Sequence, residues 1–200
     1  MKTETNDKNP EGHDTRAPGE TDFDWQAVID KYYPKGTLRR SILLKHSRQV
    51  ADLAIEISHR HGLDLDDKSI EAGAMLHDIG IFLTDAPGID CHGTEPYLRH
   101  GVLGAELLAG EGAPDYLVEI ARRHTGAGIT AEDIKEFNLP LPPGNYMPHT
   151  LLEKLICYAD KFYSKSGEMR LKPLERVRAS MQRFSPRVAE RFEKLHEQFV

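Results

Sequence analysis

The stretch Ala72-Gly73-Ala74-Met75-Leu76-His77-Asp78-Ile79-Gly80 decides the fold, because it places two ionisable residues inside a small, apolar segment. Ile70, Gly73 and His77 recur at three- and four-residue steps, which predicts a helix that buries this face. His77 is therefore expected to point into the core, with Asp78 beside it at the helix end. A buried imidazole or carboxylate is costly unless it is hydrogen-bonded, paired or bound to a metal.

Four other ionisable residues lie on the apolar stripes of separate predicted helices: His46, His100, His124 and Asp160. His46, for example, follows Leu43 by three residues and precedes Val50 by four. Any one of them alone is more often a hydrogen-bonded core residue than a ligand. Together with His77 they make five inward-pointing residues on five segments, and one shared site explains them more economically than five local solutions.

The residue types at this shared site favour a divalent metal. Imidazole and carboxylate ligands suit Mn, Fe, Co, Ni, Zn or Mg, whereas Cys91 and Cys157 offer no paired thiolates for a soft metal. A divalent ion in an open site lowers the pKa of bound water toward ~7, and two ions ~3.5–4 Å apart can clamp a phosphoryl group. The sequence therefore predicts a centre for one or two divalent ions.

The remainder of the chain favours an all-α class, because helical periodicity recurs and no convincing alternating strand is found. Helices are expected from about residue 22 or 24 to 34, and over 37–61, 66–77, 97–109, 114–124, 131–137, 150–164 and 173–200. Residues 1–21 are polar and rich in charge, proline and glycine, which is typical of a disordered tail. Residues 22–172 are expected to form the domain, with the helices of 173–200 packed on it or extending it.

Composition excludes several classes of protein. The 200 residues are 39% hydrophobic and 29% charged, and the net charge of −6 argues against binding to a nucleic-acid polymer. No apolar run approaches the ~20 residues of a membrane-spanning helix, and the polar N-terminus lacks the apolar core of a secretion signal. Two cysteines do not make a disulfide framework, so a cytoplasmic protein without a membrane partner is expected.

The order His46, then His77-Asp78, then Asp160 resembles the H…HD…D signature of the HD-domain metal-dependent phosphohydrolases. Residues 72–80 are similar to the HDIG form of the central motif. The resemblance implies a helical bundle around a central metal site held by these four residues. It also implies hydrolysis of phosphate esters or phosphoanhydrides, most often of nucleotides, by metal-activated water.

The resemblance covers roughly residues 40–165 and extends to two further histidines. It implies that His100 and His124 are the additional ligands of two-metal members, with Asp78 as the bridge. Many HDIG members have a lysine after the glycine, where this chain has Ile81. The cyclic-dinucleotide branch has a paired histidine and a GYP element, and this chain has neither after His124.

A phosphorylated substrate needs cationic partners. Lys161 follows Asp160 directly, and Arg48, two residues from His46, is expected to edge the cleft. Arg48 and Lys161 are therefore candidates for catalysis and substrate binding, together with Asp78 at the reacting centre. Asp85 and His92, in the loop after the HD pair, are further candidates for substrate contact and for a general acid. A solvated helix face or a polar loop is the plainer interpretation of these side chains.

Three functions remain open at this stage. The first is an enzyme that hydrolyses a small phosphorylated substrate, and segment 152–161 is similar to the branch that splits dinucleoside polyphosphates. The second is a non-catalytic nucleotide sensor, which Ile81 favours and the complete ligand set opposes. The third is a helical interaction protein, with the charged C-terminal helices as the contact surface of a homodimer.

Overall fold

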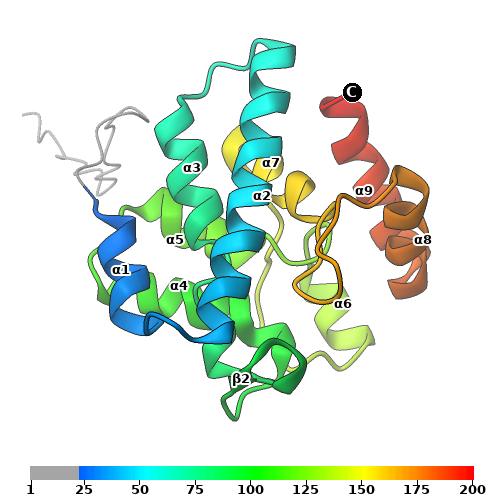
Figure 1. Cartoon of the computed structure of the whole chain (residues 1–200). Coiled ribbons are helices and arrows are strands. Elements are labelled where there is room, and N and C mark those ends of the chain that lie inside the picture. The colour runs from blue at the N-terminus through cyan, green and yellow to red at the C-terminus, as the bar shows by residue number, and fades with distance from the viewer. Residues whose placement is uncertain (1–22) are drawn as a thin grey trace, which may run out of the picture.

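The structure, a computed structural model, describes residues 23–200, so the tail predicted for residues 1–21 lies outside the described residues. The described part is a bundle of helices with one very small sheet, as Figure 1 shows, which confirms the all-α class. Among these residues, no helix has both the length and the apolar character needed to cross a bilayer.

The described elements alternate long helices with short turns. The helices are α1 (Trp25–Tyr32), α2 (Leu38–His61), α3 (Asp67–Leu76), α4 (His100–Gly110), α5 (Asp115–Arg123), α6 (Ala131–Glu136), α7 (Leu151–Asp160), α8 (Leu174–Phe184) and α9 (Pro186–Gln198). The short 3-10 turns are η1 (Ile81–Leu83), η2 (Pro87–Ile89) and η3 (Tyr97–Arg99). The strands β1 (Asp85–Ala86) and β2 (Cys91–His92) pair antiparallel.

Local sequence explains where two of the inner helices, α2 and α7, begin. The Thr37 side chain accepts a hydrogen bond from the Arg40 amide at the start of α2, and Gly62 ends that helix in the left-handed conformation. The Thr150 side chain accepts a hydrogen bond from the Glu153 amide at the start of α7. These caps fix the phase of each helix and hence which side chains face inward.

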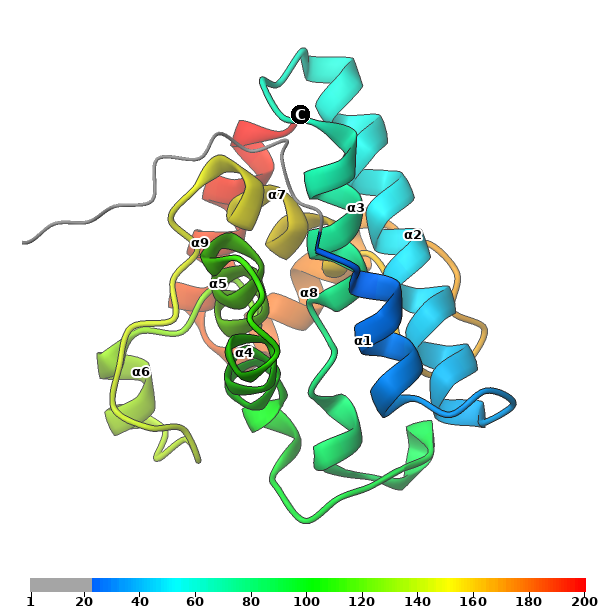
Figure 2. The same ribbon diagram turned by 90° about the vertical axis from the view of Figure 1, so that its left-hand side faces the viewer.

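The centre of the bundle is formed by α2, α3, α5 and α7. A Cβ on Gly73 of α3 would lie 2.6 Å from Ile156 Cδ1 and 2.7 Å from Ile120 Cδ1, so the glycine lets α3 approach α7 and α5 without displacing these two side-chain ends. Gly80 allows a similar approach, since its Cβ would lie 2.3 Å from the carbonyl oxygen of His100. The Gly80 approach brings the chain after the HD pair against α4. Figure 2 shows α4 and α5 side by side.

The C-terminal helices α8 and α9 pack against α7. Phe192, Leu195 and Phe199 belong to the same buried cluster as Ile156. Phe192 also stacks on Tyr158 of α7, with ring centroids 5.8 Å apart. The last two helices therefore complete the hydrophobic core: α9 contacts α7, and α8 lies beside α9, as Figure 1 shows.

Three local expectations were wrong. The helix expected over 97–109 is interrupted, because the 3-10 turn η3 leads into α4 only at His100. The helix expected over 150–164 ends at Asp160, and the chain then turns through Lys161. The small β1–β2 sheet was not foreseen, since each strand has only two residues and no alternation can show in so short a segment.

Candidate metal centre

Five of the six predicted ligands lie at or next to helix ends that meet inside the bundle, and His46 lies within α2. His46 is in α2, His77 and Asp78 end α3, His100 begins α4, His124 ends α5 and Asp160 ends α7. All six are buried. The structure therefore brings these ionisable residues together, as the shared-site hypothesis predicted.

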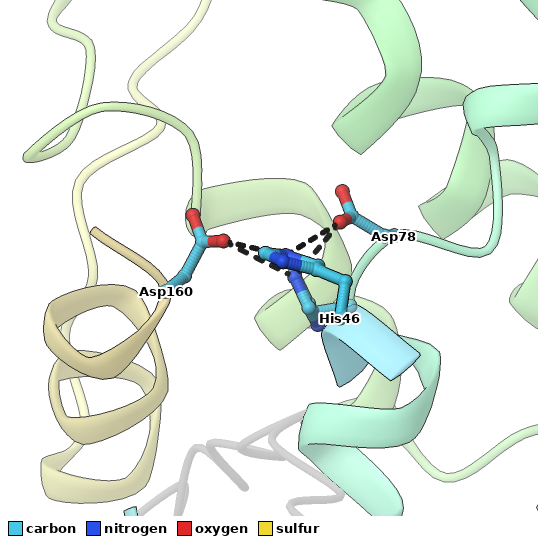
Figure 3. A group of neighbouring side chains, drawn as sticks. His46, Asp78 and Asp160 are labelled. Atoms are coloured by element: carbon cyan, nitrogen blue, oxygen red, sulfur yellow. Dashed lines mark hydrogen bonds and ion pairs between the residues drawn. The ribbon is translucent and has the colours of Figure 1, made fainter. Parts of the chain in front are cut away.

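One group of ligand atoms comes from His46, His77, Asp78 and Asp160, and these atoms lie within 4.8 Å of one another. His46 Nε2 is 2.9 Å from Asp160 Oδ1 and 3.2 Å from Asp78 Oδ2. His77 Nε2 is 3.0 Å from Asp78 Oδ2. Figure 3 shows the carboxylates of Asp78 and Asp160 on opposite sides of the His46 ring. Two imidazoles and two carboxylates thus converge on one point.

A second group comprises Asp78, His100 and His124. The Nε2 atoms of both histidines lie 3.4 Å from Asp78 Oδ1, which is the oxygen that the first group does not use. Asp78 therefore presents one oxygen to each group. This is the arrangement that a bridging carboxylate requires.

The hydrogen bonds of the histidines fix which nitrogen faces the centre. The Nδ1 atoms of His77, His100 and His124 donate to the backbone carbonyls of Ala74, Tyr97 and Ala121, at 2.6, 2.7 and 2.8 Å. In the neutral ring the Nε2 atom then carries a lone pair, which is the form that binds metals.

On His100 and His124, whose pKa values burial lowers, these lone pairs have no protein donor to satisfy them. His77 differs: burial lowers its pKa, but the Asp78 and Asp160 carboxylates outweigh burial and raise it to about 9 while no cation is bound. His100 Nε2 and His124 Nε2 lie 2.9 Å apart, and with both Nδ1 atoms protonated neither can donate to the other. Burial and the neighbouring His124 lower the pKa of His100 to about 3, so this ring is neutral near pH 7. The Asp78 Oδ1 atom is buried without a hydrogen bond. A divalent cation fits this donor set, because it satisfies lone pairs that otherwise face one another.

Both carboxylates are charged despite their burial. Burial favours the neutral acid, but His77 and Lys165 hold the pKa of Asp78 well below its usual value. Burial acts in the same direction on Asp160, and Lys161 and Lys165 outweigh it, so its pKa is also low. The centre therefore holds two negative charges close together, which is the electrostatic requirement for a cation site.

A sequence model of the HD domain matches residues 43–164, which is more than half of the chain. The chain belongs to the HD-domain family. The match contains His46, the His77-Asp78 pair and Asp160, so the resemblance drawn from the sequence is confirmed. Proteins of this family generally bind divalent metals and hydrolyse phosphate compounds.

Relatives of this HD domain include longer proteins. The chain is 35% identical over 174 residues to a tRNA (cytidine(56)-2'-O)-methyltransferase of Thermoplasma volcanium, covering 87% of the chain and 46% of that protein. It is 40% identical over 121 residues to an uncharacterised protein of Methanocaldococcus jannaschii, covering 59% of the chain and 64% of that protein. The chain thus spans about half to two thirds of the length of these relatives.

The fold of this HD domain resembles that of a solved structure, the HD domain of the L. monocytogenes phosphodiesterase PgpH. The TM-score is 0.51, the sequence identity is 17%, and the similarity covers 86% of this chain and 94% of the other. At this level of identity the similarity concerns the fold. It confirms the helical bundle, and the central His/Asp cluster is observed in this chain itself.

Two lysines accompany the carboxylates of the HD domain. Lys161 was predicted: its Nζ lies 2.6 Å from Asp160 Oδ2 and donates to the His124 carbonyl at 3.0 Å. Lys165 was missed, although its Nζ lies 2.7 Å from Asp78 Oδ2. It follows the end of α7, where no helical periodicity points to the site, and its spacing from Lys161 was the only available signal.

The other predicted substrate contacts lie elsewhere. Arg48 pairs with Glu71 at 2.6 Å and lines a separate cavity beside Trp25. His92 is exposed and lies 3.4 Å from Asp90, and Asp85 is exposed on β1. The structure does not bring Arg48, Asp85 or His92 to the His/Asp cluster.

The cluster opens into a cavity of about 530 Å³. Its lining includes His100, His124 and Asp160 of the centre and both Lys161 and Lys165. A small ligand therefore has access to the buried carboxylates and to two ammonium groups at once. Cavities of ~300–1,000 Å³ are the usual size for small-molecule sites.

Proposed function

We propose that this chain is a metal-dependent phosphohydrolase that cleaves a phosphate ester or phosphoanhydride of a nucleotide or a related small molecule. The observation that carries the proposal is the shared carboxylate: Asp78 faces His46 and His77 with one oxygen and His100 and His124 with the other. Membership of the HD-domain family supports the same reaction class.

The residues around the cavity would have separate roles in such a reaction. A bound divalent ion supplies Lewis acidity, which lowers the pKa of water and offsets charge on the phosphoryl oxygens. The backbone carbonyls hold the imidazoles in the orientation of a ligand, and the buried carboxylates supply the negative charge. Lys161 and Lys165 present ammonium groups to the anionic substrate in the cavity.

The reaction adds one water molecule to the substrate. A bond forms between phosphorus and the water oxygen, and the bond between phosphorus and the leaving-group oxygen breaks. One proton of the water ends on the leaving group or in the solvent. No other reactant is needed, which agrees with a site that consists of metal-ligating side chains and lysine ammonium groups.

A second candidate follows from the name of the Thermoplasma relative. In this second candidate the HD domain would bind tRNA and assist a neighbouring part of a longer protein, and would itself hydrolyse no substrate. The net charge of −6 and the enclosed position of the His/Asp cluster favour a small substrate over a polymer. Because the chain matches only 46% of that relative, the relative's named activity does not transfer to it directly.

One experiment distinguishes these candidates. The purified chain is analysed for bound metal and then assayed for phosphate release from nucleotides, small phosphomonoesters and tRNA with Mn²⁺, Fe²⁺, Co²⁺, Ni²⁺, Zn²⁺ and Mg²⁺. We expect bound metal and turnover of a small substrate, both lost in Asp78→Asn and both retained in Asp85→Asn, whose side chain is exposed. Tight tRNA binding without turnover of any substrate would support the second candidate instead.

A further inference from the structure

The cavity beside the metal centre has a wall that lies outside the residues matched by the family model. This wall consists of Lys165 and Lys172, from the segment after α7, and of Ser180, Met181 and Phe184 of α8. This wall shares the cavity with His100, His124 and Asp160 of the centre, so a substrate attacked at the centre can contact the wall with its remaining part. The side chains of this wall therefore indicate which kind of leaving group the cavity accepts.

Lys172 is the first feature of this wall. It is half-buried, and no ion pair is found for it among residues 23–200, whereas Lys161 and Lys165 each contact a carboxylate. Its backbone is held by a hydrogen bond from its amide to the Phe162 carbonyl, at 2.8 Å. An ammonium group without a counter-ion in a cavity attracts an anionic group of the ligand.

Phe184 is the second feature. It is the last residue of α8 and is 66% exposed, although most large apolar residues of the bundle are buried. It lines the cavity next to Met181, which is 5% exposed and anchored in the core. An exposed aromatic ring supported by a buried side chain offers a flat surface on which a nucleobase stacks.

These features line one and the same cavity: His100, His124 and Asp160 of the centre, Lys161 and Lys165, Lys172, and Phe184 at the end of α8. We propose that Lys172 and α8 form a subsite for the leaving group, and that the substrate is a nucleotide carrying a second phosphate. The terminal phosphate is attacked at the centre, the second phosphate contacts Lys172, and the base stacks on Phe184. This inference rests on the proposed function and adds the class of substrate.

The volume of the cavity agrees with this assignment. At about 530 Å³ it lies within the ~300–1,000 Å³ that small-molecule sites usually have, which leaves room for a base as well as phosphates. Hydrolysis would break the bond between the terminal phosphorus and its bridging oxygen, take up one water, and release phosphate and the shorter nucleotide. The leaving group then keeps both its contacts, with Lys172 and with Phe184.

Four compounds separate the two contacts: ADP has a second phosphate and a base, inorganic pyrophosphate only the second phosphate, AMP only the base, and glycerol phosphate neither. Lys172→Met should weaken the use of ADP and pyrophosphate by about tenfold in kcat/KM and leave AMP and glycerol phosphate within about twofold. Phe184→Ala should weaken the use of ADP by about tenfold in kcat/KM and spare pyrophosphate and glycerol phosphate. AMP should be affected less than ADP, because its base lies one phosphate closer to the centre. Lys194→Met and Phe137→Ala, which change an exposed lysine and an exposed phenylalanine outside this cavity, should match the parent.

Equilibrium binding separates failure of this inference from failure of the proposed function. Calorimetry with α,β-methylene ADP, which cannot release its terminal phosphate, should show a Kd that rises about tenfold in each subsite variant. Binding of this compound without turnover of any substrate would overturn the hydrolase and support the subsite. Turnover with the same specificity in the parent, Lys172→Met and Phe184→Ala would overturn the subsite and leave the hydrolase standing. Thermal unfolding within about 1 °C of the parent establishes that each variant is folded.

Discussion

Lys165→Met should destabilise the metal-free protein strongly and the metal-loaded protein much less. The Lys165 Nζ lies 2.7 Å from Asp78 Oδ2, and the side chains are 13% and 0% exposed. At an effective dielectric constant of about 20, two unit charges at this separation attract by about 6 kcal/mol. Relief of the burial cost of the lysine offsets part of this attraction, and loss of about 3 kcal/mol of unfolding free energy is expected.

For a chain of this length a loss of about 3 kcal/mol lowers the Tm by ~6–12 °C. The measurement is thermal unfolding with excess chelator and again with saturating divalent metal. A cation beside Asp78 takes over the role of the ammonium group, so the metal-loaded variant should lose less than half as much. Lys194→Met, on the exposed side of α9, should shift the Tm by about 1 °C or less in both conditions. An equal loss with and without metal would refute the reasoning.

Three further predictions concern the packing, the second ligand group and an ion pair. Gly80→Ala should lower the free energy of unfolding by ~3 kcal/mol or more, because the added Cβ would lie 2.3 Å from the His100 carbonyl oxygen. The control is Gly110→Ala, whose added Cβ meets nothing within 4 Å and which should be neutral or slightly stabilising; urea unfolding measures both. His100→Ala should reduce the metal content of a two-ion centre to about one ion per chain by elemental analysis, and an unchanged content would show a single-ion site. Asp133 is buried, which raises its pKa, but the Thr130 amide and Arg191 lower it overall. The Asp133 carboxylate therefore adds ~1–2 kcal/mol to the free energy of unfolding above pH ~4, and this contribution is lost as the pH falls through the lowered pKa. In urea unfolding, Asp133→Asn should be less stable than the parent at pH 7 and should approach the parent at acid pH.

The metal centre could be predicted because its ligands interrupt apolar periodicity. His46 and Asp160 are polar residues at positions that helix geometry assigns to the core, and such positions need a partner. The sequence thereby indicated that they converge, without indicating the partner atoms. Only the structure shows that each of the two Asp78 oxygens faces a different group of histidines.

The surroundings of the centre could not be predicted in the same way. Lys165 reaches Asp78 only because the chain turns after α7, and no periodic pattern encodes that turn. Arg48 was the opposite case: two residues along a helix rotate the side chain by about 200°, so it lies on the other side of α2 from His46 and pairs with Glu71 on α3. Proximity in sequence was a poor guide to proximity in space for both.

The distance in sequence between the ligands has a consequence for biosynthesis. His46 and Asp160 lie 2.9 Å apart although 114 positions separate them in the chain. A nascent chain emerging from the ribosome can present the first histidine and the HD pair long before the last carboxylate is translated. Capture of the ion by the full ligand set must therefore wait until nearly the whole domain has been synthesised. Metal uptake would mark the completion of folding, and a chain truncated before α7 would leave the ribosome unable to retain its cofactor.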